Sequence, residues 1–127
     1  MEGKSDIKPI IWLGDSLVNL RDFPETVRSE FGFAIYRAQE GAKHVAAKPM
    51  KGFGGAGVLE VVEDDDGKTY RAIYTVKFKG VIYVLHIFQK KSKQGSKTPQ
   101  GDIELIRARL QWAQAHYAKW QEENEKR

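Results

Sequence analysis

Three β-rich runs separated by tight turns constrain the fold of this 127-residue chain more than any other feature. The first run, residues 58–62, leads to Asp66-Gly67, and Asp-Gly between two β-rich runs is a strong signal for a hairpin. The second run covers residues 70–78 and ends at a second turn, Lys79-Gly80. The third run, residues 81–88, is apolar without interruption, which indicates a central strand covered on both faces. We therefore predict an antiparallel meander of three strands.

Helical patterns flank the predicted meander. Before it, residues 10–13 form a short apolar run and predict a first strand. Asp15 or Ser16 is a suitable cap for a short helix, because both side chains can accept a backbone N–H. Pro24 suits the first position of a second helix, which we expect to end near Gly41.

The segment after the meander predicts a last helix that begins near Asp102. Its apolar residues recur at intervals of three and four, namely at Ile103, Ile106, Leu110, Ala113, Tyr117 and Trp120. Together these elements predict an α+β fold in one domain spanning residues 1–127, with its core at about residues 10–120. We expect a small curved antiparallel β-sheet with the N-terminal helical hairpin and the C-terminal helix packed on one face.

Basic residues concentrate in the middle of the chain. The formal net charge is only +4, but residues 43–97 hold eleven Lys and Arg against five Asp and Glu, a net charge of +6. The remainder of the chain has a net charge of −2. Such an uneven distribution favours a surface that binds a polyanion, and a lysine-rich solvated surface is the alternative.

Several classes of protein are excluded by the composition. The absence of cysteine excludes disulfides and thiolate metal sites. No apolar run approaches the ~20 residues needed to cross a bilayer, and residues 1–9 lack the apolar core of a signal peptide. The glycine-rich residues 52–57 lead into a strand, whereas a phosphate-binding loop ends in Gly-Lys-Ser/Thr and opens a helix. We therefore expect a cytoplasmic protein that does not bind nucleotides through this loop.

Arg71 is the first candidate for a binding residue. On the second run it lies on the face opposite a mostly aromatic row formed by Tyr70, Tyr74 and Phe78. A guanidinium fixed on a strand can bond two phosphate oxygens at once. The alternative is an ion pair with Glu60 across the hairpin, and we predict that Arg71 faces a groove and forms no core ion pair.

Lysines on either side of the meander are further candidates. Lys90, Lys91 and Lys93 follow the third run, where they could stabilise the charge of a phosphoryl transition state or belong to a solvated loop. Lys48 and Lys51 precede the glycine-rich loop and would lie near Arg71 and these lysines if the sheet curls.

Two other polar groups have a structural interpretation. Residues 64–66 are three aspartates without the glutamate and spacing of a calcium loop, so we interpret them as turn residues. His86 lies in the most apolar strand and is either a core histidine or a general acid or base beside Arg71.

The order and spacing of these segments resemble the RelE/ParE toxin superfamily, in particular its HigB-like branch of phage-related proteins. The resemblance covers roughly residues 10–115. It is carried by residues 58–61, 70–74 and 83–92, by Trp12-Leu13-Gly14, Phe23-Pro24, Val27-Arg28 and Phe31-Gly32 near the start, and by Thr98-Pro99, Asp102-Ile103-Glu104 and Ala108 near the end.

This resemblance implies a RelE-like fold and the toxin of a type II toxin–antitoxin system. Such a toxin is a ribosome-dependent mRNA endoribonuclease, an mRNA interferase that inhibits translation. The implied chemistry needs no metal and no cofactor, because a ribose 2′-hydroxyl attacks the adjacent phosphodiester. The implied partners are the ribosome, mRNA and a cognate helix-turn-helix antitoxin.

The resemblance also implies roles for individual residues. Arg71, Lys90 and Lys91 would bind the phosphate, and a lysine or His86 would transfer protons. Tyr74 would stack on or orient a base, although its position beside the other aromatic residues also predicts core packing. Beside these, we predict from the basic segments that Lys48, Lys51, Lys93 and Lys97 bind RNA.

Some members of the superfamily inhibit DNA gyrase. The alternative function is therefore a non-catalytic protein that binds nucleic acid or gyrase, or a degenerate phage-derived protein. A protein that only binds needs no more than the basic surface, so its affinity should fall gradually and depend steeply on salt when charges are removed.

Overall fold

The computed structural model describes residues 7–90 and 98–125, which form three helices and five strands. The elements follow in the order β1 (Ile10–Trp12), α1 (Ser16–Asp22), α2 (Glu25–Gln39), β2 (Lys48–Pro49), β3 (Val58–Asp65), β4 (Lys68–Thr75), β5 (Ile82–Lys90) and α3 (Gln100–Glu125). The strands form one sheet in the order β1-β5-β4-β3-β2. The predicted α+β class is confirmed. The prediction of an antiparallel sheet is wrong at one edge, because β1 pairs with β5 in parallel.

The predicted hairpin between β3 and β4 is confirmed. Asp65 pairs with Lys68, so the loop consists of Asp66 and Gly67 alone. These two residues have φ values of 52° and 78°, the left-handed backbone that a two-residue turn between right-twisted strands requires. The interpretation of residues 64–66 as turn residues is correct for Asp66 alone. Asp64 and Asp65 belong to β3, because they pair with Thr69 and Lys68 of β4.

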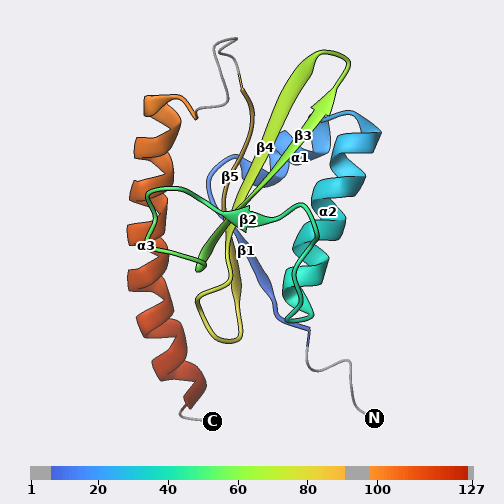
Figure 1. Cartoon of the computed structure of the whole chain (residues 1–127). Coiled ribbons are helices and arrows are strands. Elements are labelled where there is room, and N and C mark those ends of the chain that lie inside the picture. The colour runs from blue at the N-terminus through green and yellow to red at the C-terminus, as the bar shows by residue number, and fades with distance from the viewer. Residues whose placement is uncertain (1–6, 91–97, 126–127) are drawn as a thin grey trace.

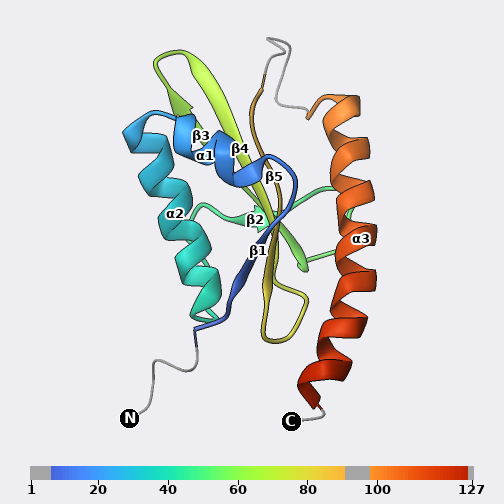
Figure 2. The same ribbon diagram turned by 180° about the vertical axis from the view of Figure 1, so that it is seen from behind.

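The helices cover both faces of the sheet, so the prediction that they share one face is wrong. On one face α1 and α2 pack against Tyr70, Ala72 and Tyr74 of β4. On the other face, Ile106 and Ala113 of α3 pack with residues of β4 and β5 such as Ile73. Figures 1 and 2 show the sheet between α2 on one side and α3 on the other. The physical reason is β5, whose residues 82–88 are all buried and therefore need cover on both sides.

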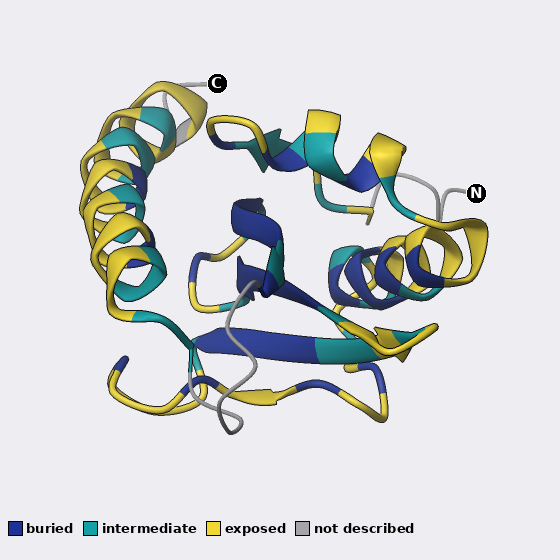
Figure 3. Ribbon diagram, turned by 90° about the horizontal axis from the view of Figure 1, so that it is seen from above, coloured by how far each residue is buried: buried dark blue, intermediate teal, exposed yellow. Residues whose placement is uncertain are grey.

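The apolar stripe predicted for the last helix is confirmed. Ile106 and Ala113 are fully buried, and the other four residues of the stripe pack partly buried against the same cluster. Figure 3 shows that the remaining surface of α3 is mostly exposed. No helix in residues 7–90 or 98–125 is long and apolar enough to cross a membrane.

The short strand β2 has no counterpart in the predicted elements. Lys48 pairs with Glu60 and Pro49 with Leu59, so β2 forms the sheet edge next to β3. The glycine-rich segment that follows is a loop, as predicted. Phe53 in this loop is buried on the α3 side, where the guanidinium of Arg107 lies 4.7 Å from its ring centroid. This contact holds the loop against α3.

Candidate nucleic-acid interface

A groove of about 740 Å³ lies where β2, β3 and β4 meet the start of α3. The groove lies on the sheet face that α3 partly covers. Arg71 points to this face, because its neighbours on β4, Tyr70 and Ala72, point to the face that α1 and α2 cover. Its volume falls within the range of ~300–1,000 Å³ that is usual for small-molecule sites. The groove is lined by Lys48, Pro49, Met50, Lys51, Glu60, Val62, Arg71, Thr98 and Ile103.

Strand β2 brings two lysines to this groove. Lys48 lies directly opposite Glu60 in the sheet register, and Lys51 follows three residues later. Both lysines are exposed. Figure 1 shows the segment around β2 crossing the sheet from the end of α2 towards α3. The sequence prediction that Lys48 and Lys51 approach Arg71 therefore agrees with where the structure places them.

Arg71 and Glu60 form a buried ion pair at the wall of the groove. Arg71 Nη1 lies 2.5 Å from Glu60 Oε2, and the two side chains are 6% and 10% exposed. The same nitrogen donates to Thr98 Oγ1 at 3.0 Å. The prediction that Arg71 forms no core ion pair is therefore wrong, because its guanidinium pairs with Glu60 in a buried position, although Arg71 also lines the groove. Because Arg71 lines the groove, a phosphate bound there would lie next to its guanidinium.

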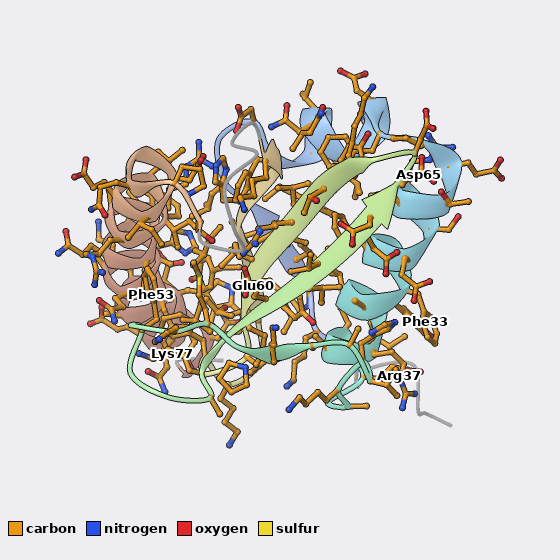
Figure 4. All side chains as sticks on the ribbon, turned by 45° about the horizontal axis from the view of Figure 1, so that its top comes forward. Phe33, Arg37, Phe53, Glu60, Asp65 and Lys77 are labelled. Carbon is orange, nitrogen blue, oxygen red and sulfur yellow. The ribbon has the colours of Figure 1, made fainter. Side chains whose placement is uncertain are left out.

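Glu60 is the site residue that the sequence analysis missed, since it was considered only as a partner for Arg71. Figure 4 shows Glu60 near the middle of this face, with Asp65 at the far end of the hairpin and Phe53 beside α3. A two-residue turn at Asp66-Gly67 places Glu60 opposite Ile73 and therefore on the same sheet face as Arg71. The register of the predicted hairpin was therefore the signal that could have placed Glu60 on the same face as Arg71.

The lysines after β5 are only partly described. Lys90, the last residue of β5, pairs with Thr69 and lies on the same face as Arg71, which pairs with Phe88. Its side chain is buried, and it is not among the residues that line the groove. Lys91, Lys93 and Lys97 lie outside the described residues.

His86 is buried and contacts two partly buried polar residues of α3. Its Nε2 lies 2.8 Å from Asp102 Oδ1, and its Nδ1 lies 3.3 Å from Arg109 Nη1. Because a guanidinium only donates, Nδ1 is the acceptor and Nε2 carries the proton that Asp102 accepts. Burial lowers the pKa of His86, with the positive charge of Arg109 acting in the same direction, although Asp102 opposes them. Both ring nitrogens are engaged, which favours the interpretation as a core histidine.

Tyr74 lies in the core on the sheet face opposite the groove. It is fully buried with the residues that pack under α1 and α2. Burial raises the pKa of its hydroxyl to about 12. This placement favours the packing interpretation of Tyr74 over contact with a base in the groove.

The groove combines three cations with one carboxylate among its lining residues, which suits an anionic ligand. No group of three or more His, Asp or Glu side chains in the described residues is arranged to hold a metal ion.

The model of one protein family, described as "Phage derived protein Gp49-like (DUF891)", matches residues 18–111. This match covers more than half of the chain and includes the groove residues from β2, β3, β4 and the start of α3. The family is associated with RelE/ParE-like toxins. No curated protein and no solved structure matches the chain.

Proposed function

Because this chain belongs to the Gp49-like family of phage-derived proteins, we propose that it is a HigB-like toxin that cleaves mRNA on the ribosome. Membership of this toxin-associated family implies an antitoxin partner. We propose that this partner is a helix-turn-helix protein whose acidic surface covers the groove, since complementary charge speeds association. The observation that carries the proposal is the Arg71–Glu60 pair at the wall of a groove that also holds Lys48 and Lys51.

The cations of the groove bind the scissile phosphate in this proposal. Arg71 is fixed on a central strand, so its guanidinium is preorganised for a phosphate, whereas Lys48 and Lys51 are exposed and supply adjustable charge. Lys90 lies outside the groove lining but on the same sheet face as Arg71, and it is proposed, with Lys91, to bind a neighbouring phosphate of the RNA. Positive groups placed where charge develops stabilise the transition state more than the ground state.

Glu60 is the proposed proton acceptor. Its carboxylate contacts Arg71, so a phosphate bound by Arg71 places the neighbouring ribose within reach of Glu60. Glu60 takes the proton of the 2′-hydroxyl while the 2′-oxygen bonds to phosphorus. The bond from phosphorus to the 5′-oxygen then breaks, and Lys48 or Lys51 donates a proton to the departing oxygen. The products are a 2′,3′-cyclic phosphate and a 5′-hydroxyl.

A second candidate function is binding without cleavage. The observation that favours it is the same ion pair, because a buried Arg–Glu pair that also bonds Thr98 is what a purely structural role requires. In that case Lys48 and Lys51 alone bind nucleic acid or gyrase. The two functions differ in the role of Glu60, whose charge assists cleavage but opposes the binding of an anion.

The test is to express the wild-type chain and Glu60→Gln in cells and to map the 5′ ends of mRNA, with translation running and with translation blocked. We expect new, translation-dependent ends from the wild type and at least ~100-fold fewer from Glu60→Gln, the usual size of a general-base effect. Glu122→Gln, an exposed change on α3, is the matched control and should cleave as the wild type does. Growth arrest without new RNA ends would contradict the nuclease and favour the second function.

A further inference from the structure

The groove has an apolar side that the phosphate chemistry does not use. Val62 and Ile103 line it and remain partly exposed, and Met50 lies beside them with its side chain buried in the core below α3. Val62 on β3 and Ile103 on α3 therefore leave part of their aliphatic surface uncovered at the same groove. Here they face the open space of the groove.

The charged and apolar sides of the groove come from different elements. Lys48 and Lys51 belong to the β2 segment, and Arg71 lies on β4. The apolar residues are Val62 on β3, Ile103 in the first turn of α3, and Met50, which directly follows β2. One site therefore offers positive charge together with an aliphatic surface. A nucleotide has the matching character, since its phosphate is anionic and the faces of its base are apolar.

We propose that the apolar side of the groove, where Val62 and Ile103 are partly exposed beside the buried Met50, is a subsite for one nucleobase of an RNA strand whose phosphate lies on Arg71, Lys48 and Lys51. This proposal rests on the proposed function, because it assumes that RNA is the anion in the groove. Aliphatic side chains contact the face of a base and do not read its hydrogen-bonding edge. The subsite therefore accepts purines and pyrimidines with similar affinity.

The contribution of the base follows from the area that it covers. The lining residues that the structure describes include no aromatic ring, so the ~1–3 kcal/mol of stacking on an aromatic residue is not available. Contact with partly exposed aliphatic groups is weaker, and we expect the base to improve affinity about 5- to 10-fold over ribose phosphate alone.

The test uses the full chain and compares uridine 5′-monophosphate, adenosine 5′-monophosphate and ribose 5-phosphate, with binding followed through the methyl NMR signals. We expect both nucleotides to bind about 5- to 10-fold more tightly than ribose 5-phosphate and to shift the methyl signals of Met50, Val62 and Ile103. Equal affinity for the nucleotides and ribose 5-phosphate would overturn the subsite, as would binding that leaves these methyl signals unchanged. Neither result bears on RNA cleavage, so failure of the subsite is distinguishable from failure of the proposed function.

Two variants separate the base from the phosphate. Ile103→Ser should lower the affinity for uridine 5′-monophosphate about 5-fold and leave that for ribose 5-phosphate unchanged, whereas Ile103→Val should behave as the wild type. Thermal unfolding of both variants checks that the fold is kept. An equal loss of affinity for both ligands in a folded Ile103→Ser would contradict a role in base binding.

Discussion

We expect the intact Arg71–Glu60 ion pair to add little to the free energy of unfolding, whereas removing one partner should lower that free energy strongly. Its side chains are 6% and 10% exposed, so a charge left without its partner would have little access to water. Removing one partner of a buried ion pair typically costs 3–5 kcal/mol, because the remaining charge is uncompensated. The pair borders an open groove, so we expect the lower end of this range, about 3 kcal/mol, for Arg71→Met or Glu60→Leu. In a chain of this size that loss lowers the melting temperature by roughly 10 °C.

The double variant Arg71→Met/Glu60→Leu removes both charges and supplies two apolar side chains. Replacing a buried ion pair by apolar residues of similar volume is often neutral or stabilising. We therefore expect the double variant to be more stable than either single variant. The additive expectation for two such changes is a loss of about 6 kcal/mol, so the two positions should couple by at least about 3 kcal/mol.

Urea unfolding of the wild type, both single variants and the double variant measures this coupling. The exposed Lys119→Met on α3 also loses one cation and should stay within ±0.5 kcal/mol of the wild type. Single variants that each cost less than about 1 kcal/mol would refute the reasoning, since the pair would then behave as a solvated surface pair. Additive costs in the double variant would also refute it.

Three further predictions concern His86, Gly14 and the two lysines of the groove. Because burial lowers the pKa of His86 in the folded protein, the unfolded state binds more protons below about pH 6.5, and stability falls as the pH drops. In His86→Gln, the free energy of unfolding in urea should fall less steeply between pH 7.5 and 5 than in the wild type, by at most about 1.4 kcal/mol per pH unit. The same slope in both proteins would contradict this. Gly14 has a φ of +54°, and a Cβ there would overlap Arg109 Nη2. Gly14→Ala should therefore cost about 2 kcal/mol in urea unfolding, and a cost below about 0.5 kcal/mol would contradict the strain. The double variant Lys48→Ala/Lys51→Ala should bind single-stranded RNA more weakly in filter binding, and the slope of log affinity against log salt should be smaller by about 1.4. An unchanged slope would show that neither lysine contacts the RNA.

The sequence predicts the meander well because its signals are local. The Asp66-Gly67 turn depends on the backbone of two residues, and the stripe on α3 depends on spacing within one helix. The arrangement of the layers is not local, which is why the single-face prediction failed. The apolar run of β5 already required cover on both faces, so its burial pattern contained the information that the helices divide between them.

The candidate site was only partly predictable for the same reason. Arg71 follows from strand alternation, but whether its guanidinium pairs with Glu60, faces the groove or does both depends on the exact register and on α3. The two partners of His86 are Asp102 and Arg109, both from α3, and no pattern in β5 indicates them. The position of Tyr74 was decided by which helices cover its face of the sheet.

The proposed function depends on attack by a ribose 2′-hydroxyl, and one substitution in the substrate tests this directly. Purified ribosomes are programmed with an mRNA that carries a single 2′-deoxyribose on the 5′ side of a mapped cut, and an all-ribose mRNA is the control. We predict that the purified chain cuts the control to a 2′,3′-cyclic phosphate and a 5′-hydroxyl and leaves the 2′-deoxy position intact. Cleavage at the 2′-deoxy position, or no cleavage of the control, would contradict the account.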